Sequence, residues 1–168
     1  MFMNELIHGG FMKIQLTNVK HAKFMSQETE CFSATIVIDG KICGQVSNEG
    51  HGGGNIYHPW SVSTTLNDHA KTLPKMKTNY GELEMDADLV IGDLFTKWQL
   101  EKELKRTLKT RILFVRDGKL LQTNKGTSQD IEAEIKNPQL VTRLRAEKVL
   151  NQLSFDEALS IFTETVNI

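Results

Sequence analysis

The sequence predicts an α+β fold, in which an antiparallel sheet built from two Asp-Gly hairpins carries helices packed on one face. Strand-like apolar segments flank both Asp39-Gly40 and Asp117-Gly118. A long segment with apolar residues at helical spacing separates the two hairpins, and further helical patterns follow the second one. Hairpins combined with helices in this way favour α+β over a parallel α/β fold. The chain has 168 residues and no linker-like segment, so residues 12–168 are expected to form a single domain.

The first hairpin follows a half-buried strand over residues 13–19, where polar and apolar residues alternate. In the next segment, residues 31–38, Phe32, Ala34 and Ile36 share one face. Asp-Gly suits a two-residue type I′ turn, because both positions need positive φ. With residues 41–47 as the return strand, this turn places Cys43 opposite Ile36.

The remaining elements follow from apolar spacing and helix-capping signals. The second hairpin pairs residues 111–116 with residues 119–123, and the helix before it has acidic residues at its start and basic residues at its end. Thr127 with Asp130 resembles a capping box, and that helix should end before Pro138. Ser154 and Glu157 form a clearer capping box for the last helix. Residues 148–150 suit a short strand.

Whole-chain composition excludes several classes of protein. The formal net charge is −1, and no segment approaches the length of apolar residues that a membrane span requires. Two cysteines are too few for a disulfide framework, which favours a cytoplasmic protein. No membrane partner and no cofactor are expected. Residues 1–11 show no period and precede a strand that begins at Met12, so we interpret them as an extension that is either non-native or disordered.

The segment from Ser47 to Trp60 is the most unusual part of the chain. It contains four of the twelve glycines and two of the five histidines. From Asn48 to about Gly81 the chain lacks a sustained period, and long irregular segments within a domain are commonly functional. Tyr and Trp side chains on a rigid turn suit recognition of another protein. The residues expected to contact a ligand or partner are Asn48, Gly50, His51, Gly52, Gly53, Asn55, Tyr57, His58 and Trp60.

Three other chemistries are open for this segment. Consecutive glycines can form an anion-binding nest, although the Lys-Ser/Thr of a phosphate loop is missing. For catalysis, His51 would act as a general base on Ser47 or on a substrate, oriented by Glu49. For metal binding, His51, His58 and His69 would supply three nitrogen ligands, although their spacing matches no zinc motif.

Charge is uneven along the chain. Between Lys97 and Lys125 there are nine basic and three acidic residues, which suits contact with nucleic-acid phosphates as well as an ordinary solvated helix face. The basic residues considered for nucleic-acid binding are Lys97, Lys102, Lys105, Arg106, Lys109 and Arg111.

The run Ser47-Asn48-Glu49-Gly50-His51-Gly52-Gly53 after a hairpin resembles a loop of small, uncharacterised bacteriophage and prophage proteins. The resemblance implies an accessory protein of a phage or mobile element in the cytoplasm of a bacterial host, and it brings no activity or catalytic residue. The leading prediction is therefore a non-catalytic protein that binds, and in one version inhibits, a host or phage macromolecule. The alternative is a small enzyme or ligand-binding protein that uses the Gly/His loop on a phosphate-containing or metal-bound ligand.

Overall fold

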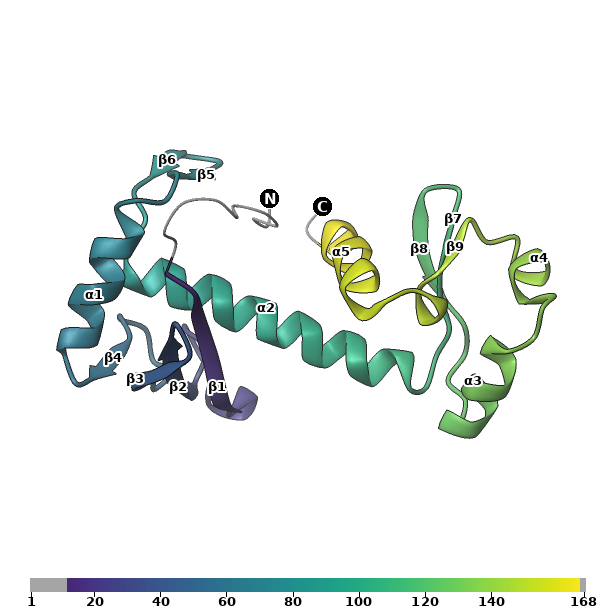
Figure 1. Ribbon diagram of the computed structural model, residues 1–168, viewed down its shortest axis with the longest axis horizontal. Helices are drawn as coiled ribbons and strands as arrows, with labels where there is room; N and C mark the ends of the chain where they lie inside the picture. The colour runs from purple at the N-terminus through teal and green to yellow at the C-terminus, as the bar shows by residue number, and fades with distance from the viewer. Residues whose placement is uncertain (1–11, 167–168) are drawn as a thin grey trace. The chain divides into compact units, whose positions relative to one another are not determined.

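The computed structural model describes residues 12–166, which form antiparallel sheets and helices of an α+β protein (Figure 1). The predicted class is confirmed. The expectation for residues 1–11 lies outside the described residues. The chain divides into two compact units, and the boundary between Thr96 and Lys97 falls inside one helix rather than in a linker. None of the described helices is both long and apolar enough to cross a membrane.

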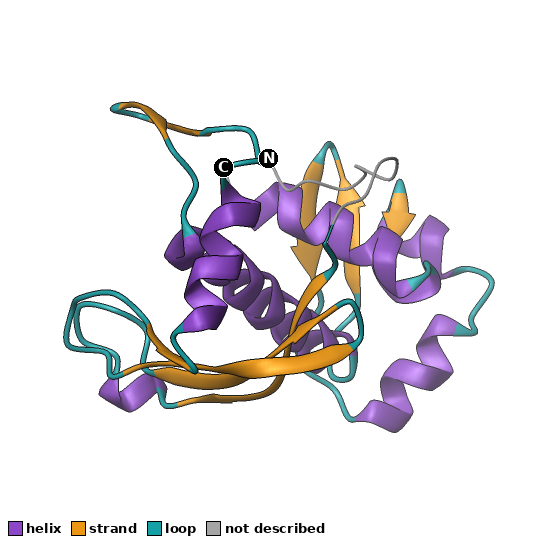
Figure 2. Ribbon diagram, turned by 60° about the vertical axis from the view of Figure 1, so that its left-hand side comes forward, coloured by secondary structure: helices purple, strands orange, loops and turns teal. Residues whose placement is uncertain are grey.

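The N-terminal unit is built on a four-stranded antiparallel sheet with the order β1-β2-β3-β4. Figure 2 shows helices over one face of this sheet. A separate two-stranded hairpin, β5-β6, follows the first helix. The elements are β1 (Ile14–His21), η1 (Lys23–Met25), β2 (Phe32–Ile38), β3 (Lys41–Asn48), β4 (Ile56–His58), α1 (Ser61–Ala70), β5 (Met76–Thr78), β6 (Gly81–Leu83) and the first part of α2 (Ala87–Leu108).

The core of this unit lies between the sheet and its helices. The alternation predicted for β2 is confirmed, because Phe32, Ala34, Ile36 and Ile38 are all buried. Phe32 stacks on Phe95 of α2 with ring centroids 4.3 Å apart. The intervening β2 residues Ser33, Thr35 and Val37 are exposed or half-buried, so one face of the strand meets the core, as expected for an antiparallel sheet covered on one side.

The first Asp-Gly turn forms as predicted, but the register beyond it differs. Asp39 and Gly40 both have positive φ, 49° and 78°, as a type I′ turn requires. A β-bulge then makes Cys43 the extra residue, so that Gly44 rather than Cys43 lies opposite Ile36. The shift has a steric reason. A Cβ at the position opposite Ile36 would lie only 2.6 Å from the carbonyl oxygen of His58, so glycine rather than cysteine occupies this position.

The stretch expected to be irregular, from Asn48 to Gly81, contains β4, α1 and the β5-β6 hairpin. Helix α1 was missed because its buried positions combine Val62 and Leu66 with Ser63 and Ala70, which gives a weak apolar period. The strands were missed because each has only three residues. Pairing with neighbouring strands, rather than local sequence, determines such short elements.

The C-terminal unit contains a second antiparallel sheet, with the order β8-β7-β9, so the two Asp-Gly hairpins belong to separate sheets and not to one. Asp117 and Gly118 again have positive φ. The elements after α2 are β7 (Leu113–Arg116), β8 (Lys119–Gln122), α3 (Ser128–Ile135), α4 (Leu140–Leu144), β9 (Lys148–Val149), η2 (Leu150–Gln152) and α5 (Phe155–Val166).

The central strand β7 is buried on both faces, which corrects the expectation of helices on one face only. Leu113 packs in a cluster with Leu104 of α2 and Phe162 of α5. Phe114 packs in a different cluster with Ile131 of α3. The continuous apolar run Ile-Leu-Phe-Val is the pattern of a strand that is covered on both sides.

Both predicted capping boxes are confirmed in this unit. The Thr127 side chain accepts from the Asp130 backbone N–H, and the Asp130 side chain accepts from the Thr127 backbone N–H. Ser154 and Glu157 exchange the same pair of bonds at the start of α5. The predicted strand at residues 148–150 forms as β9, and α3 ends before Pro138 as expected.

The close approach at Gly44 predicts a large effect of a single methyl group. In Gly44→Ala, the added Cβ would lie within 3 Å of the His58 carbonyl oxygen and of Val62 Cγ2, so we expect a loss of about 1–3 kcal/mol in the free energy of unfolding. Gly92→Ala, in α2 of the same unit, meets nothing within 4 Å and should stabilise by up to about 1 kcal/mol. Urea unfolding followed by circular dichroism measures both. Equal stability of the two variants would contradict the packing at Gly44.

Candidate functional site

The side-chain amide of Asn48 holds the glycine turn in place. Asn48 is buried at the end of β3, and its Oδ1 accepts from Thr29 Oγ1 at 2.7 Å and from the backbone N–H of Gly50 at 3.0 Å. Its Nδ2 lies 3.3 Å from the carbonyl oxygen of Gly53 and 3.2 Å from Oδ1 of Asn55. One buried amide therefore ties the first part of the turn to its last part.

Gly50 joins the turn to the segment between β1 and β2. Its carbonyl oxygen accepts from the backbone N–H groups of Gln27 and Glu28, at 2.9 and 3.1 Å. Its φ is +85°, and a Cβ here would lie 2.5 Å from the carbonyl oxygen of Met25. Only glycine fits both the backbone conformation and the contact, so the role of Gly50 is structural.

Asp88, in the first turn of α2, holds the far end of the segment. One carboxylate oxygen accepts from the Asn55 backbone N–H at 3.2 Å, and the other accepts from the Tyr57 hydroxyl at 2.6 Å. Tyr57 is buried on β4. Burial is the main cause that raises the pKa of Tyr57 above its ordinary value, and the bond to Asp88 raises it further. The phenol therefore stays a neutral hydrogen-bond donor.

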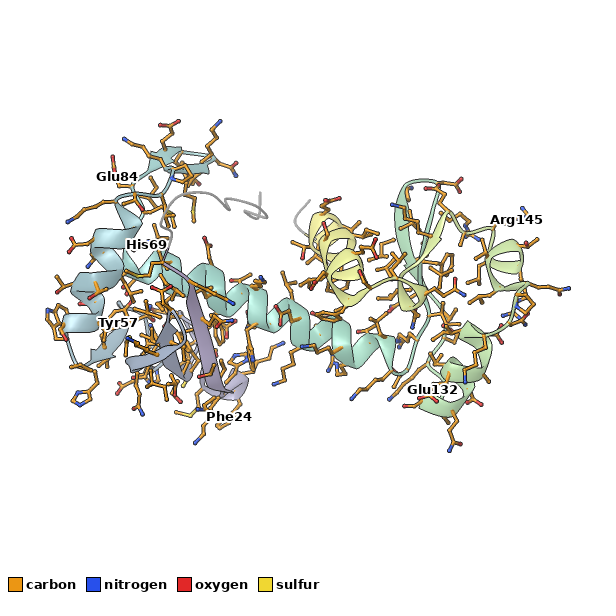
Figure 3. All side chains as sticks on the ribbon, viewed as in Figure 1. Phe24, Tyr57, His69, Glu84, Glu132 and Arg145 are labelled. Carbon is orange, nitrogen blue, oxygen red and sulfur yellow. The ribbon has the colours of Figure 1, made fainter. Side chains whose placement is uncertain are left out.

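Large side chains on and beside this fixed backbone project into solvent. Trp60 and Ile56 are 71% and 55% exposed. Phe24 of η1 is 89% exposed (Figure 3). Met25 follows Phe24 and is also exposed. His51 is exposed, and its Nδ1 lies 3.3 Å from Oε1 of Gln27. We define the turn surface as the exposed side chains of His51, Ile56 and Trp60, together with those of Phe24 and Met25 in η1, which lies just before the residues that bond to Gly50.

The structure divides the predicted contact residues into two groups. Asn48, Gly50 and Tyr57 are buried and take part in the bonds that fix the segment. That they contact a partner stays a prediction. Asn55 is half-buried and donates its backbone N–H to Asp88. The predicted residues that are exposed are His51, Gly52, Gly53, His58 and Trp60.

The residues of the catalytic alternative are not arranged as a catalytic set. Ser47 lies in β3 and pairs with Ile56, while Glu49 is exposed. Among residues 12–166, the hydrogen bond described for His51 goes to Gln27 and not to Ser47 or Glu49. The geometry therefore provides neither a base–nucleophile pair nor a carboxylate that orients the imidazole.

The histidines of the metal alternative are not brought together. His58 lies on β4, and His69 lies in the last turn of α1 (Figure 3). Within the described part of the chain, no three His, Cys, Asp or Glu side chains are close enough to hold a metal ion. The alternative ligand set of His51, His58 and His69 is thus not supported by the fold.

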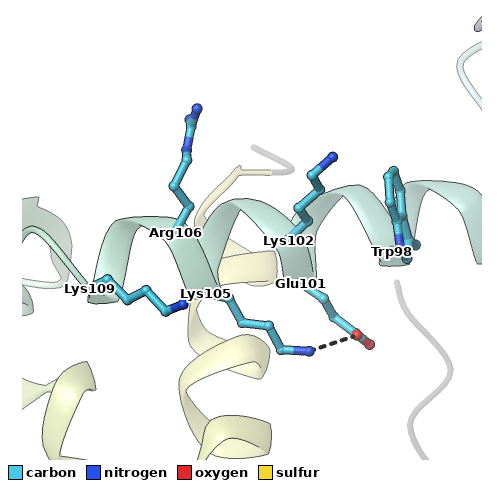
Figure 4. Close-up of a pocket in the computed structure, with 6 residues that line it drawn as sticks. All are labelled: Trp98, Glu101, Lys102, Lys105, Arg106 and Lys109. Carbon is cyan, nitrogen blue, oxygen red and sulfur yellow. Dashed lines mark ion pairs between the residues drawn. The ribbon is translucent and has the colours of Figure 1, made fainter. Parts of the chain in front are cut away.

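The predicted basic residues also separate into groups. Arg111 is half-buried and donates from Nη1 to the carbonyl oxygen of Thr123 at 2.9 Å, which gives it a structural role. Lys97 is exposed on α2 but does not line the depression formed by the other four. These four are Lys102, Lys105, Arg106 and Lys109, and they lie along one side of α2 (Figure 4).

Sequence reasoning missed several residues that form or support the turn surface. The sequence indicates Asp88 as one of the acidic residues near the start of the long helix, but not as a support of the turn, because its partners Asn55 and Tyr57 are over 30 residues away. Phe24 and Met25 lie in a short 3₁₀ helix between strands, and no apolar period marks them. Ile56 could have been found, since it lies between the glycines and the aromatic residues.

Comparison of the chain with protein-family models, curated proteins and solved structures finds no match. Inference about function therefore depends on the geometry described above.

The bonds of Asn48 predict a large effect on stability. Asn48→Ala would leave the buried Gly50 N–H without its acceptor, so we expect a loss of about 2–3 kcal/mol in the free energy of unfolding. Asn79→Ala, an exposed position in the β5-β6 hairpin, should change it by less than about 0.5 kcal/mol. Hydrogen exchange should accelerate at residues 50–55 in the first variant only. An unchanged exchange rate there would show that Asn48 does not hold the turn.

The Tyr57–Asp88 bond predicts a dependence on pH. Tyr57→Phe removes a donor to a carboxylate, and we expect a loss of about 1–3 kcal/mol near pH 7. Because folding raises the pKa of Tyr57, its contribution is complete below the unfolded pKa of about 10 and is lost as pH rises toward the folded value. The stability difference between wild type and Tyr57→Phe should therefore narrow above pH 10 in urea unfolding. Tyr80→Phe, at an exposed tip, is the control; a difference that stays constant with pH would contradict the assignment.

Proposed function

We propose that this protein is a non-catalytic accessory protein that acts by binding another protein through the turn surface. The observation that carries the proposal is the combination of exposed apolar side chains with a backbone that is already fixed. More than half of the surface of Trp60, Ile56 and Phe24 is exposed. The glycine segment from Asn48 to Asn55, by contrast, is held by hydrogen bonds to the side chains of Asn48 and Asp88.

Energetics favours a binding role for such a surface. Aromatic and large aliphatic side chains supply much of the binding energy of protein interfaces, and Trp is among the most frequent contributors. A segment that needs no ordering on binding loses little conformational entropy, so more of the contact energy contributes to affinity. Nothing inside the unit covers these side chains in the described structure, and exposing them to water without a partner is unfavourable.

The chemistry of the segment favours a protein partner over a small ligand. The glycine turn satisfies much of its own hydrogen bonding, because the Gly50 carbonyl, the Gly50 N–H and the Gly52 N–H all have partners within the unit. The N–H groups of Gly50 and Gly52 therefore point at acceptors within the unit and not at a bound anion, as a phosphate nest would require. The setting in a phage or mobile element, and inhibition as the mode of action, stay predictions from the sequence resemblance.

The test begins with partner capture from the cells that naturally express the chain, followed by affinity measurement with the purified partner. The variant is Trp60→Ser/Ile56→Ser, and the matched control is Tyr80→Ser, a fully exposed aromatic residue in the same unit. We expect the double variant to bind at least about tenfold more weakly, since central aromatic residues contribute 2 kcal/mol or more. The control should bind as the wild type does.

Hydrogen exchange of the complex locates the contact independently. We expect protection of residues 56–60 and of the η1 segment on binding. A partner that binds the double variant with unchanged affinity, or that is lost only with Tyr80→Ser, would overturn the assignment to the turn surface. Circular dichroism confirms that each variant is folded before its affinity is compared.

A further inference from the structure

A row of cations follows one side of α2 in the C-terminal unit. Lys102, Lys105, Arg106 and Lys109 are all exposed. Lys102 and Lys109 each lie three or four residues from Lys105 and from Arg106, which places the four on the same face of a helix. Together with Trp98 and Glu101 they line a shallow depression (Figure 4). We call these six residues the α2 stripe.

The stripe is separate from the side of α2 that stabilises the fold. Leu100 and Leu104 are buried in the apolar cluster with Leu113 and Phe162, and Leu108 packs against the same cluster. The leucine row and the stripe lie on different sides of a helix with 3.6 residues per turn. Packing of the unit therefore does not require four cations on the stripe.

Positive charge on the stripe is only partly compensated. Lys105 Nζ lies 3.8 Å from the carboxylate of Glu101, the one acidic residue among the six, and 4.8 Å from the ring centroid of Phe155. Within the described chain, Arg106 and Lys109 form no ion pair. The macrodipole favours cations in the last turn of α2, but that effect declines within one turn and does not account for Lys102.

An aromatic ring begins the stripe. Lys102 Nζ lies 4.7 Å from the ring centroid of Trp98, and the indole is half-buried. The row from Trp98 to Lys109 covers twelve residues, a helix length of about 16 Å, with roughly one cationic position per helical turn. A row of cations with an aromatic side chain is the combination that binds a sugar–phosphate backbone while offering a surface for an unstacked base.

We propose that the α2 stripe binds single-stranded nucleic acid, with Lys102, Lys105, Arg106 and Lys109 contacting phosphates and Trp98 contacting a base. Charge complementarity supports this occupant. A membrane surface is disfavoured, because an interfacial helix needs a free apolar face and the leucines of α2 are in the core. A duplex is disfavoured, because its bases are paired and stacked and offer no unstacked base for Trp98 to contact.

The experiment measures binding of a fluorescein-labelled 20-nucleotide thymidine oligomer by anisotropy at several salt concentrations. The variant is Lys102→Gln/Arg106→Gln/Lys109→Gln in the full chain. The matched control is Lys71→Gln/Lys75→Gln/Lys77→Gln, three exposed lysines of the N-terminal unit, which changes net charge equally. We expect the stripe variant to bind about tenfold or more weakly at 0.1 M salt, with the slope of log K against log salt reduced by about 2. The control should keep most of the wild-type affinity and slope.

Tryptophan emission provides a second readout, since the chain has two tryptophans and Trp60→Phe leaves only Trp98. In this background we expect the oligomer to quench Trp98 emission. Absence of binding at low salt, equal weakening of both triple variants, or unchanged Trp98 emission would overturn the proposal. Tighter binding to a duplex of the same length, to anionic phospholipid vesicles or to polyglutamate would also overturn it.

Discussion

The buried amide of Asn48 is the interaction on which the arrangement of the N-terminal unit's turn depends. A glycine-rich segment has high conformational entropy in the unfolded chain, and few side chains in it can pack. Here a single residue supplies both acceptor and donor to the segment, linking Thr29, Gly50 and Asn55. The backbone bonds to Gly50 and the carboxylate of Asp88 then hold its two ends. As a result, a segment with four glycines has one defined conformation and presents Ile56 and Trp60 to solvent.

The same constraint separates the structural from the functional part of the segment. Asn48 and Tyr57, which the sequence suggested as contact residues, form hydrogen bonds within the unit. The buried phenol of Tyr57 stays neutral beside Asp88. Side chains without such internal bonds, chiefly aliphatic and aromatic ones, are the ones left at the surface. The exposed surface is therefore more apolar than the sequence suggested. This shift favours recognition of a protein over chemistry at His51.

The C-terminal unit is held by different interactions. Its central strand β7 packs on both faces, and Asn151 accepts from the Leu113 N–H while donating to the carbonyl oxygens of Leu108 and Arg111. Because the leucine row of α2 is used by this core, the polar side of the helix is available for another purpose. Each unit thus has its own core and its own exposed chemistry, apolar in the first and cationic in the second.

Local sequence by itself determined the α+β class, both type I′ turns, the long helix and both capping boxes. These features depend on residues within a few positions of one another, such as Asp39 with Gly40 or Ser154 with Glu157, so their physics is visible in the chain. Tertiary structure decided the bulge at Cys43, the helix α1, the separation of the hairpins into two sheets, and the bonds of Asp88. Each of these depends on groups distant in sequence, as Gly44 does on the His58 carbonyl and Tyr57 on Asp88. Local patterns do not encode such contacts, because their free energy arises only when the chain has folded.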